Sequence, residues 1–277
     1  MIRIEKLGFS YGQVPVLKNI TMNLEPGKIY GLLGENGVGK TTLLTLLAGL
    51  KKPLQGSIDI DGSAPYSRTP QALENQFYLA DEMLPVPMKA AEYARITGEF
   101  WPNYKQDTFE EIMELFENTS DKKMNEMSTG QLKKTYISLA LALGCKYLFL
   151  DEPTNGLDIP SKAQFRSALM KYTGEDSTIV RSTHQVRDLE NIIDPIIILD
   201  RQDVLLNASL EDISRKLYFD YGTQLHPESL YSEQLPGGFI QVYPNAEGAD
   251  SKVNIEALFN AVHHNKEFIK GLFAETL

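Results

Sequence analysis

The sequence is short of cysteine and has no long apolar stretch. Cys145 is the single cysteine among 277 residues, so the chain cannot form a disulfide with itself, and we expect a buried thiol in a reducing compartment. No run of about 18 consecutive apolar residues occurs, which excludes a helix that spans a bilayer. The first residues also lack the apolar segment of a secretory signal. These absences together predict a cytoplasmic protein.

Basic residues are in the minority. Lys and Arg number 27 against 37 Asp and Glu, a formal net charge of -10, whereas proteins that bind nucleic acid normally present a basic face. We therefore expect no nucleic acid partner. Hydrophobic residues make up 42% and charged residues 23%, as in an ordinary globular protein, and the length suits two domains or one large α/β domain with an appendage.

The first part of the chain combines antiparallel strands with a strand, a loop and a helix. Apolar and polar residues alternate in residues 2–24 and 56–62, which predicts a β-rich flap. Residues 28–33 form a short apolar run typical of a strand, and a strongly helical segment follows Lys40. Residues 85–126 contain helical stretches and no convincing strand, so we expect a helical insertion there.

The second part of the chain alternates strands and helices. We expect helices at 131–144, 161–172 and 186–193, and buried strands at 147–150, 178–181 and 196–199. Such alternation predicts a parallel sheet covered by helices, which makes the chain an α/β protein. After about residue 217 the chain is acidic and is broken by Pro236-Gly237-Gly238, and we expect a small appendage of uncertain fold.

A glycine-rich loop stands between the predicted strand at 28–33 and the helix that follows. Residues 34–41 (GENGVGKT) satisfy the P-loop pattern G-x-x-x-x-G-K-[ST]. Glycines let backbone amides approach a triphosphate, the helix N-terminus adds its positive end, Lys40 reaches the β- and γ-phosphates, and Thr41 offers a hydroxyl to Mg²⁺. The predicted nucleotide site comprises Gly34, Asn36, Gly37, Gly39, Lys40, Thr41 and Thr42. The alternative is a plain glycine-rich turn with a surface lysine.

Two carboxylates follow the predicted strand at 147–150. Four apolar residues deliver Asp151 and Glu152 to the carboxyl edge of the sheet, where α/β proteins bind their ligands. We expect Asp151 to hold Mg²⁺, directly or through water, and Glu152 to orient and deprotonate the attacking water. The alternative is a strand end capped by solvated acids, which the upstream P-loop disfavours.

The order of these motifs resembles the ATPase subunit of ABC transporters. Residues 127–131 (MSTGQ) stand immediately before a predicted helix, in the place of the family's signature loop (Leu-Ser-Gly-Gly-Gln), and the resemblance covers about residues 2–214. It implies a P-loop ABC-type ATPase with a mixed or parallel sheet core, an antiparallel flap, a helical insertion and a C-terminal appendage. The implied domains are the ATPase at 1–216, with a helical subdomain at about 83–144, and the appendage at 217–277.

The signature loop and the loop after the two carboxylates are implied to act across a dimer. In the family, the residues that match Ser128, Gly130 and Gln131 contact ATP on the opposite subunit, and the residue that matches Asp158 couples the two sites. Thr129 replaces a glycine of the signature, yet a serine hydroxyl and free amides at a helix N-terminus still form an anion site. Without the resemblance, Ser128 is a helix cap and Asp158 belongs to a turn.

Three further residues match family positions around the nucleotide. His184 follows a predicted strand and matches the switch histidine that contacts the γ-phosphate. Tyr11 stands where the family stacks an aromatic ring on adenine, although a lone tyrosine is also typical of core packing. Residues 77–82 match the family's lid loop, which carries a glutamine. Here Asp81 occupies the aligned place, with Glu82 next to it, and we expect Asp81 to be a ligand of hydrated Mg²⁺.

The resemblance implies an ATP-binding and ATP-hydrolysing subunit that powers transport through a separate integral membrane permease. Two chains, as a homodimer at the inner face of the cell membrane, would enclose two ATP molecules. Residues 101–131 resemble export-type ATPases of the drug, bacteriocin and lantibiotic branch, and residues 85–104 offer aromatic and Met-rich material for gripping the permease. The alternative is a soluble ABC-family ATPase of translation, repair or cofactor assembly, which drives no transport.

Overall fold

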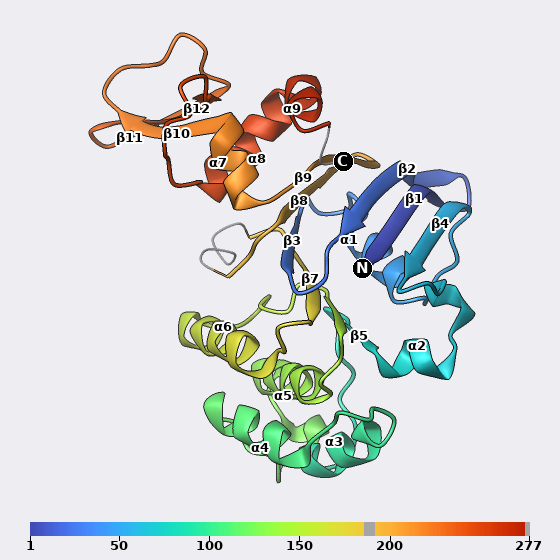
Figure 1. Ribbon diagram of the computed structural model, residues 1–277. Coiled ribbons are helices and arrows are strands. Elements are labelled where there is room, and N and C mark those ends of the chain that lie inside the picture. The colour runs from blue at the N-terminus through green and yellow to red at the C-terminus, as the bar shows by residue number, and fades with distance from the viewer. Residues whose placement is uncertain (186–191, 275–277) are drawn as a thin grey trace.

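A six-stranded sheet forms the centre of the protein. The computed structural model describes residues 1–185 and 192–274, and Figure 1 shows this sheet between the N-terminal strands and the helical part. Its strands follow the order β5-β6-β7-β3-β8-β9. They are β3 (Ile29–Leu33), β5 (Gln76–Leu79), β6 (Tyr147–Leu150), β7 (Thr178–Thr183), β8 (Ile196–Asp200) and β9 (Asp203–Ala208). The first five pair in parallel and β9 runs antiparallel to β8, which confirms the predicted mixed or parallel core.

An antiparallel flap packs beside the central sheet. β1 (Ile2–Tyr11) pairs with β2 (Val14–Leu24) and with β4 (Gln55–Ile60), as the alternation predicts. The inward residues of these strands, such as the fully buried Ile2, share one core with α1 (Lys40–Leu47) and the central strands. Burial of apolar surface contributes about 25 cal/mol per Å², so this core fixes α1 and with it the loop that precedes the helix.

A group of helices lies on the side of the central sheet away from the antiparallel flap (Figure 1). α3 (Ala90–Gly98), α4 (Gln106–Leu115) and α5 (Thr129–Ala142) form the lower part of the molecule, with α6 (Ile159–Tyr172) above α4 (Figure 1). The fully buried Phe109 anchors a core that α5 shares with the central strand β6. The helices predicted within residues 85–126 are confirmed as α3 and α4.

The C-terminal residues add a second, smaller sheet with the strand order β10-β12-β11. After α7 (Leu210–Lys216) come β10 (Leu217–Gly222), β11 (Tyr231–Leu235), β12 (Gly238–Pro244), α8 (Ile255–His264) and α9 (Lys266–Leu272). Figure 1 shows this part at the end of the molecule away from the helical insertion. The predicted division at residue 217 falls between α7 and β10, and the existence of two separate domains stays a prediction.

Two strands of the central sheet are absent from the sequence-based prediction. β5 is a short edge strand that the motif comparison assigns to the lid loop, so residues 77–79 are strand and the loop begins after them. β9 forms a tight hairpin with β8 through Arg201 and Gln202, both with positive φ. Neither strand is bounded on both sides by the glycine, proline or asparagine residues that mark a strand in sequence. The helix predicted at 186–193 lies mostly outside the described residues.

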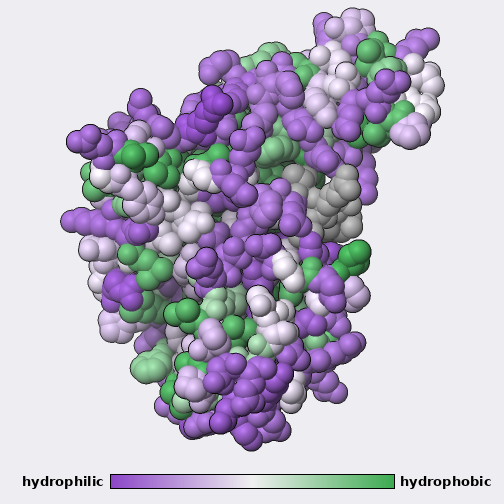
Figure 2. Space-filling view, turned by 180° about the vertical axis from the view of Figure 1, so that it is seen from behind, coloured by the Kyte–Doolittle hydropathy of each residue, from purple (hydrophilic) through white to green (hydrophobic). Residues whose placement is uncertain are grey.

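Hydrophilic side chains cover most of the face seen from behind, with smaller hydrophobic patches between them (Figure 2). Throughout residues 1–185 and 192–274, no helix combines the length and the apolar character needed to cross a bilayer.

Candidate active site

The loop between β3 and α1 has a backbone that glycine alone accommodates. A Cβ added at Gly34 would lie 2.5 Å from the carbonyl oxygen of Leu199, and Gly37 and Gly39 have φ values of 82° and 112°. Gly39 is the N-cap of α1 and supplies no side chain to bond the first N–H groups of the helix. The first turn of α1 therefore offers backbone donors and the positive end of the helix dipole to an anion.

Lys40 lies inside this loop and is almost completely buried. Its Nζ donates to the carbonyl oxygens of Gly34 (2.7 Å) and Glu35 (3.0 Å) and lies 3.8 Å from Oε1 of Glu152. Burial lowers the pKa of the Lys40 ammonium, although the charges of Glu152 and Asp151 raise it. The loop thus holds a cation whose partners are mostly neutral carbonyl oxygens.

Asp151 is held by hydroxyl groups from three different elements. Thr41 Oγ1 donates to Oδ2 of Asp151 at 2.6 Å, Ser182 Oγ donates to Oδ1 at 2.6 Å, and Tyr78 OH donates to Oδ2 at 3.3 Å. Thr41 and Asp151 bring two oxygen ligands to one point, the donor type that Mg²⁺ prefers, so these residues fit a magnesium site. Neither Ser182 nor Tyr78 has a role predicted from the sequence, although Tyr78 lies in the segment 77–82 predicted as the lid loop.

Glu152 has an unusual backbone. Its φ is 45°, in the left-handed region that few residues other than glycine adopt. Its N–H donates to Ser182 Oγ at 2.9 Å, and its Oε1 lies 2.9 Å from Nδ1 of His184, in hydrogen-bond contact. The structure therefore brings the predicted base and the predicted switch histidine together.

A cavity of about 410 Å³ opens at the P-loop and joins most of the predicted site residues. Its lining comprises Val16 and the predicted residues Tyr11, Asn36, Gly37, Gly39, Lys40, Thr41, Thr42, Asp81, Asp151 and Glu152. Tyr11 lies at the rim, 49% exposed, with Lys51 Nζ 5.0 Å from its ring centroid. One face of an aromatic ring is thus available beside the phosphate-binding loop.

The loop after β5 places Asp81, not Glu82, at the cavity. Asp81 lines it and accepts a hydrogen bond from Lys133 Nζ at 2.8 Å, whereas Glu82 is exposed outside it. Gln76 is the glutamine nearest to this loop in the sequence, but it begins β5 and does not reach the cavity. Its side chain is buried and donates to the carbonyl oxygen of Ala48. The predicted role of Asp81 as a ligand of hydrated Mg²⁺ stays a prediction.

The signature loop lies outside this cavity in the single chain. Ser128 caps α5 and forms a capping box with Gln131: each backbone N–H donates to the other side chain, at 3.3 and 3.1 Å. Ser128 is exposed, and a Cβ at Gly130 would meet nothing within 4 Å. None of these residues contributes to the lining of the P-loop cavity.

Asp158 caps α6 in a similar way. Its side chain accepts a hydrogen bond from the N–H of Ser161 at 2.9 Å, and the hydrogen bonds from Ser161 hold the pKa of Asp158 below its usual value. Asp158 likewise does not line the cavity. The predicted site residues therefore fall into two groups, one around Lys40 and one at exposed helix starts.

Comparison with known proteins identifies the family. The family model for ABC transporters matches residues 17–155. The chain belongs to the ABC transporter family. An uncharacterised ABC transporter ATP-binding protein of Methanocaldococcus jannaschii is 29% identical over 240 residues, which cover 84% of this chain and 88% of that protein. The lantibiotic transport ATP-binding protein SrtF of Streptococcus pyogenes is 28% identical over 195 residues, 70% of this chain and 84% of that protein.

A solved structure shares the fold of this ABC transporter subunit. A dimeric ATP-binding cassette in a post-hydrolysis state, bound to ADP and Pi, superposes with a TM-score of 0.67 at 22% identity, over 76% of this chain and 99% of that chain. The predicted fold class and family are thereby confirmed, and with the family an ATP-binding subunit with ATPase activity.

Proposed function

We propose that two copies of this ABC transporter subunit enclose ATP and Mg²⁺ at the cavity beside Lys40, and that hydrolysis there drives export through a membrane-spanning partner. The convergence of Lys40, Thr41, Asp151 and Glu152 at the start of α1 carries the proposal. A buried cation, an uncapped helix start and oxygen ligands for a divalent cation are together what a nucleoside triphosphate requires.

The P-loop binds the phosphates in this proposal. Lys40 exchanges the carbonyl oxygens of Gly34 and Glu35 for the β- and γ-phosphates, while the amides of Asn36, Gly37 and the first turn of α1 donate to the phosphate oxygens. Thr41 and Asp151 would hold Mg²⁺, which neutralises charge on the phosphates when it is bound. Tyr11 stacks on the base, with affinity for any purine or pyrimidine.

Glu152 accepts the proton of the water that attacks the γ-phosphorus. The attacking oxygen forms the new P–O bond, the bond to the leaving ADP oxygen breaks, and the proton moves to the Glu152 carboxylate. The 2.9 Å contact with His184 holds this carboxylate at the cavity and places the imidazole where it can also contact the γ-phosphate. Lys40 offsets the charge that develops on the transferred group.

A second copy completes the site. Ser128 is exposed and Gly130 is half-buried at the start of α5, and neither lines the cavity of its own chain. The Ser128 hydroxyl accepts from the N–H of Gln131 but keeps its own proton to donate, and a Cβ at Gly130 would meet nothing within 4 Å, so this hydroxyl and the Gly130 amide can donate to a phosphate held elsewhere. We assign Ser128, Gly130 and Gln131 to the γ-phosphate bound by the partner chain, and Asp158 to the contact between the two copies. The dimeric cassette of similar fold agrees with this arrangement.

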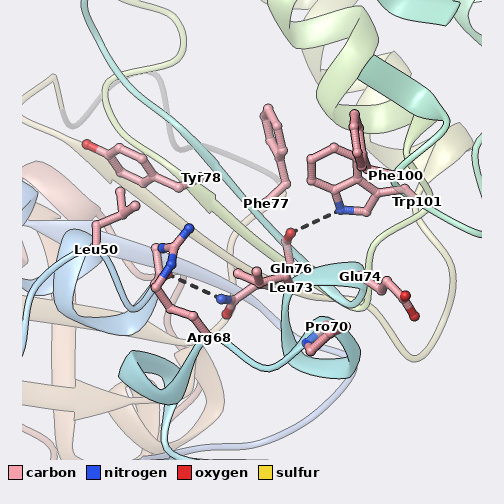
Figure 3. Close-up of a pocket in the computed structure, with 11 residues that line it drawn as sticks. Leu50, Arg68, Pro70, Leu73, Glu74, Gln76, Phe77, Tyr78, Phe100 and Trp101 are labelled. Atoms are coloured by element: carbon pink, nitrogen blue, oxygen red, sulfur yellow. Dashed lines mark hydrogen bonds between the residues drawn. The ribbon is translucent and has the colours of Figure 1, made fainter. Parts of the chain in front are cut away.

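A groove of about 500 Å³ on the side of α2 (Pro70–Glu74) is the proposed contact with the membrane-spanning partner (Figure 3). Phe77, Phe100 and Trp101 gather at one end of it, and Trp101 Nε1 donates to the carbonyl oxygen of Gln76 at 3.2 Å. Phe100 is 72% exposed, so a large apolar side chain is free to contact the partner. A short helical segment of that partner fits an apolar groove of this size.

The name of one relative supports export as the direction of transport, and the proposed contact with a membrane-spanning partner gives the location. SrtF bears the name of a lantibiotic transport protein, in agreement with the export-type resemblance of the sequence. We place the subunit at the inner face of the cell membrane, bound through the groove, where ATP is available. The formal net charge of -10 disfavours nucleic acid as the partner.

The substitution Glu152→Gln tests this function. The amide keeps the size of the side chain but cannot take a proton at neutral pH, so we expect turnover to fall by about a hundredfold or more while the Kd for ATP with Mg²⁺ stays within a few fold. Glu211→Gln is the matched control, because Glu211 is exposed and pairs only with Arg215 on α7 in the described structure. Wild-type turnover in the Glu152 variant would remove Glu152 from the reaction.

A further inference from the structure

We infer that Lys133 is a positioning residue for ATP hydrolysis, which holds the peptide of Glu152 in place and offsets the charge of Asp81. The inference rests on the proposed role of Glu152. Lys133 lies in the second turn of α5, two residues after Gln131, and belongs to none of the motifs that bind the nucleotide.

Lys133 joins two loops at the edge of the cavity through three acceptors. The residue is only 5% exposed, and its Nζ lies 2.8 Å from Asp81 Oδ1, 2.9 Å from the carbonyl oxygen of Glu152 and 3.0 Å from that of Asn155. A lysine ammonium has three protons, so each one has an acceptor. A buried ammonium is costly unless it is paired in this way, and the pairing ties α5 to the loops after β5 and β6.

The contact with Glu152 explains how its left-handed backbone is held. The N–H of Glu152 donates to Ser182 on β7, its carbonyl oxygen accepts from Lys133 on α5, and its carboxylate contacts His184. A non-glycine residue at φ 45° persists only where surrounding groups determine its conformation. Without Lys133, the carbonyl oxygen of Glu152 keeps only the hydrogen bond from the N–H of Asn155 at 3.1 Å, within its own loop, and the tie between this peptide and α5 is lost. The carboxylate is then held less firmly in the attacking position.

The contact between Lys133 and Asp81 offsets part of the negative charge that gathers at the cavity. Three carboxylates, those of Asp81, Asp151 and Glu152, line a cavity whose lining, as far as residues 1–185 and 192–274 form it, contains one cation, Lys40. A nucleotide adds further negative charge. Lys133 stands behind Asp81 with a side chain 6% exposed, against 39% for Asp81, so water screens their attraction only in part. Lys133 thus allows an aspartate to occupy the place that a neutral glutamine has in the family pattern.

The substitution Lys133→Met tests the inference, because methionine keeps the length and removes the charge and the donors. We expect kcat to fall roughly ten- to a hundredfold, as for other residues that orient reacting groups, with KM for ATP changed by less than about threefold. Lys134→Met is the matched control. Lys134 is the next residue of the same helix, and its Nζ donates to the carbonyl oxygen of Phe116 in the helical part. We expect wild-type kcat and KM for this variant.

A second substitution separates positioning from a purely structural role. In the Lys133→Met protein, Asp81→Asn removes the uncompensated charge, so we expect the double variant to lose less kcat than the product of the two single losses. A structural role alone would lower the fraction of protein that binds nucleotide, leave kcat per binding site unchanged and give no rescue. Where the methionine variant does not fold, Lys133→Gln keeps donors without charge, and rescue of its kcat by Asp81→Asn is expected in the same way.

Wild-type protein and the Glu152→Gln variant belong in the same assay. Loss of the Glu152 role, seen as full turnover in that variant, overturns the inference along with the proposed function. If the wild type turns over ATP, Glu152→Gln loses turnover as expected, and Lys133→Met keeps a wild-type kcat per binding site, the inference alone is overturned.

Discussion

Individual side chains around the P-loop cavity hold one another in place. Asp151 accepts from the hydroxyls of Thr41 and Ser182, both at 2.6 Å, and Glu152 is fixed at its N–H, its carbonyl oxygen and its carboxylate. Groups that are aimed before the reaction need no costly reorganisation during it. Hydrogen bonds of single side chains therefore set the positions of the proposed catalytic groups.

Tyr11 provides a test at the residue scale. Its ring is half exposed at the rim of the cavity, and we expect Tyr11→Ala to weaken binding of ATP and GTP alike by about 1–3 kcal/mol, because stacking does not select a base. Tyr11→Phe keeps the ring and should retain most of the affinity. Equilibrium titration with fluorescent nucleotides measures both effects.

Tyr66 offers a matched control for this prediction. It is 48% exposed and has a lysine, Lys52, above its ring, as Tyr11 has Lys51, but it lies outside the P-loop cavity. Tyr66→Ala should leave nucleotide affinity unchanged. An equal loss in both alanine variants, or none in Tyr11→Ala, would argue against stacking at Tyr11.

Residue roles that depend on local pattern are visible in the sequence, and those that depend on packing are not. Gly34 to Thr41 is one continuous segment whose spacing expresses its chemistry, so the P-loop can be found without a structure. Ser182 and Lys133 reach Asp151 and Glu152 from distant elements, β7 and α5. A serine in a strand and a lysine in a helix are common, and no spacing rule distinguishes these two.

At the scale of elements, α5 combines two functions at one end. Its capping box satisfies the N–H groups of Ser128 and Gln131, while Ser128 itself and Thr129 stay exposed. Helix stability and the proposed phosphate contact across the dimer therefore depend on the same serine. A comparison with another serine cap can separate the two roles.

Ser128→Ala and Ser209→Ala make this comparison. Ser209 caps α7 in the same manner, through a hydrogen bond from the N–H of Asp212 at 3.0 Å. Each substitution should lower the free energy of unfolding by about 1 kcal/mol, measured by chemical denaturation. In a Glu152→Gln background, only Ser128→Ala should also reduce the dimer that forms with ATP. Equal dimer yields in the two proteins would show that Ser128 acts as a cap alone.

Strands whose hydrophobic pattern mirrors their burial can be predicted from the sequence, and strands without such a pattern cannot. The alternation of residues 2–24 predicts β1 and β2, and the apolar run YLFL predicts β6, because each pattern mirrors its burial. β11 has the opposite character: its ends are half-buried and its middle three residues are exposed, so its sequence carries no strand signal. The pairing of β10 with β12 joins residues far apart in sequence, which local patterns do not report.

At the scale of the whole molecule, the C-terminal sheet and helices continue the core of the ATPase part. Leu258 of α8 and Ile269 of α9 share one buried cluster with Leu206 of β9. Ion pairs link Lys266 to Asp200 and Lys270 to Asp203 across the same boundary. These contacts tie the β8-β9 hairpin to the C-terminal part.

The chain as a whole presents the two proposed halves of the nucleotide site at separate places. The cavity beside Lys40 supplies the phosphate-binding loop and the base, and the exposed start of α5 supplies a second set of donors outside that cavity. In the proposed arrangement, two chains lie head to tail and bring each set against the other, and the dimer is the functional unit. Opening and closing of this dimer is the movement that the membrane-spanning partner would receive at the groove.

The mass of the Glu152→Gln protein in solution tests this claim most directly. Analytical ultracentrifugation should show monomers of 31.1 kDa without nucleotide and dimers of twice that mass with ATP and Mg²⁺, with one ATP retained per chain. Because the variant cannot complete hydrolysis, the closed dimer should accumulate. A protein that binds ATP tightly and stays monomeric at every concentration would contradict a nucleotide site shared between two chains.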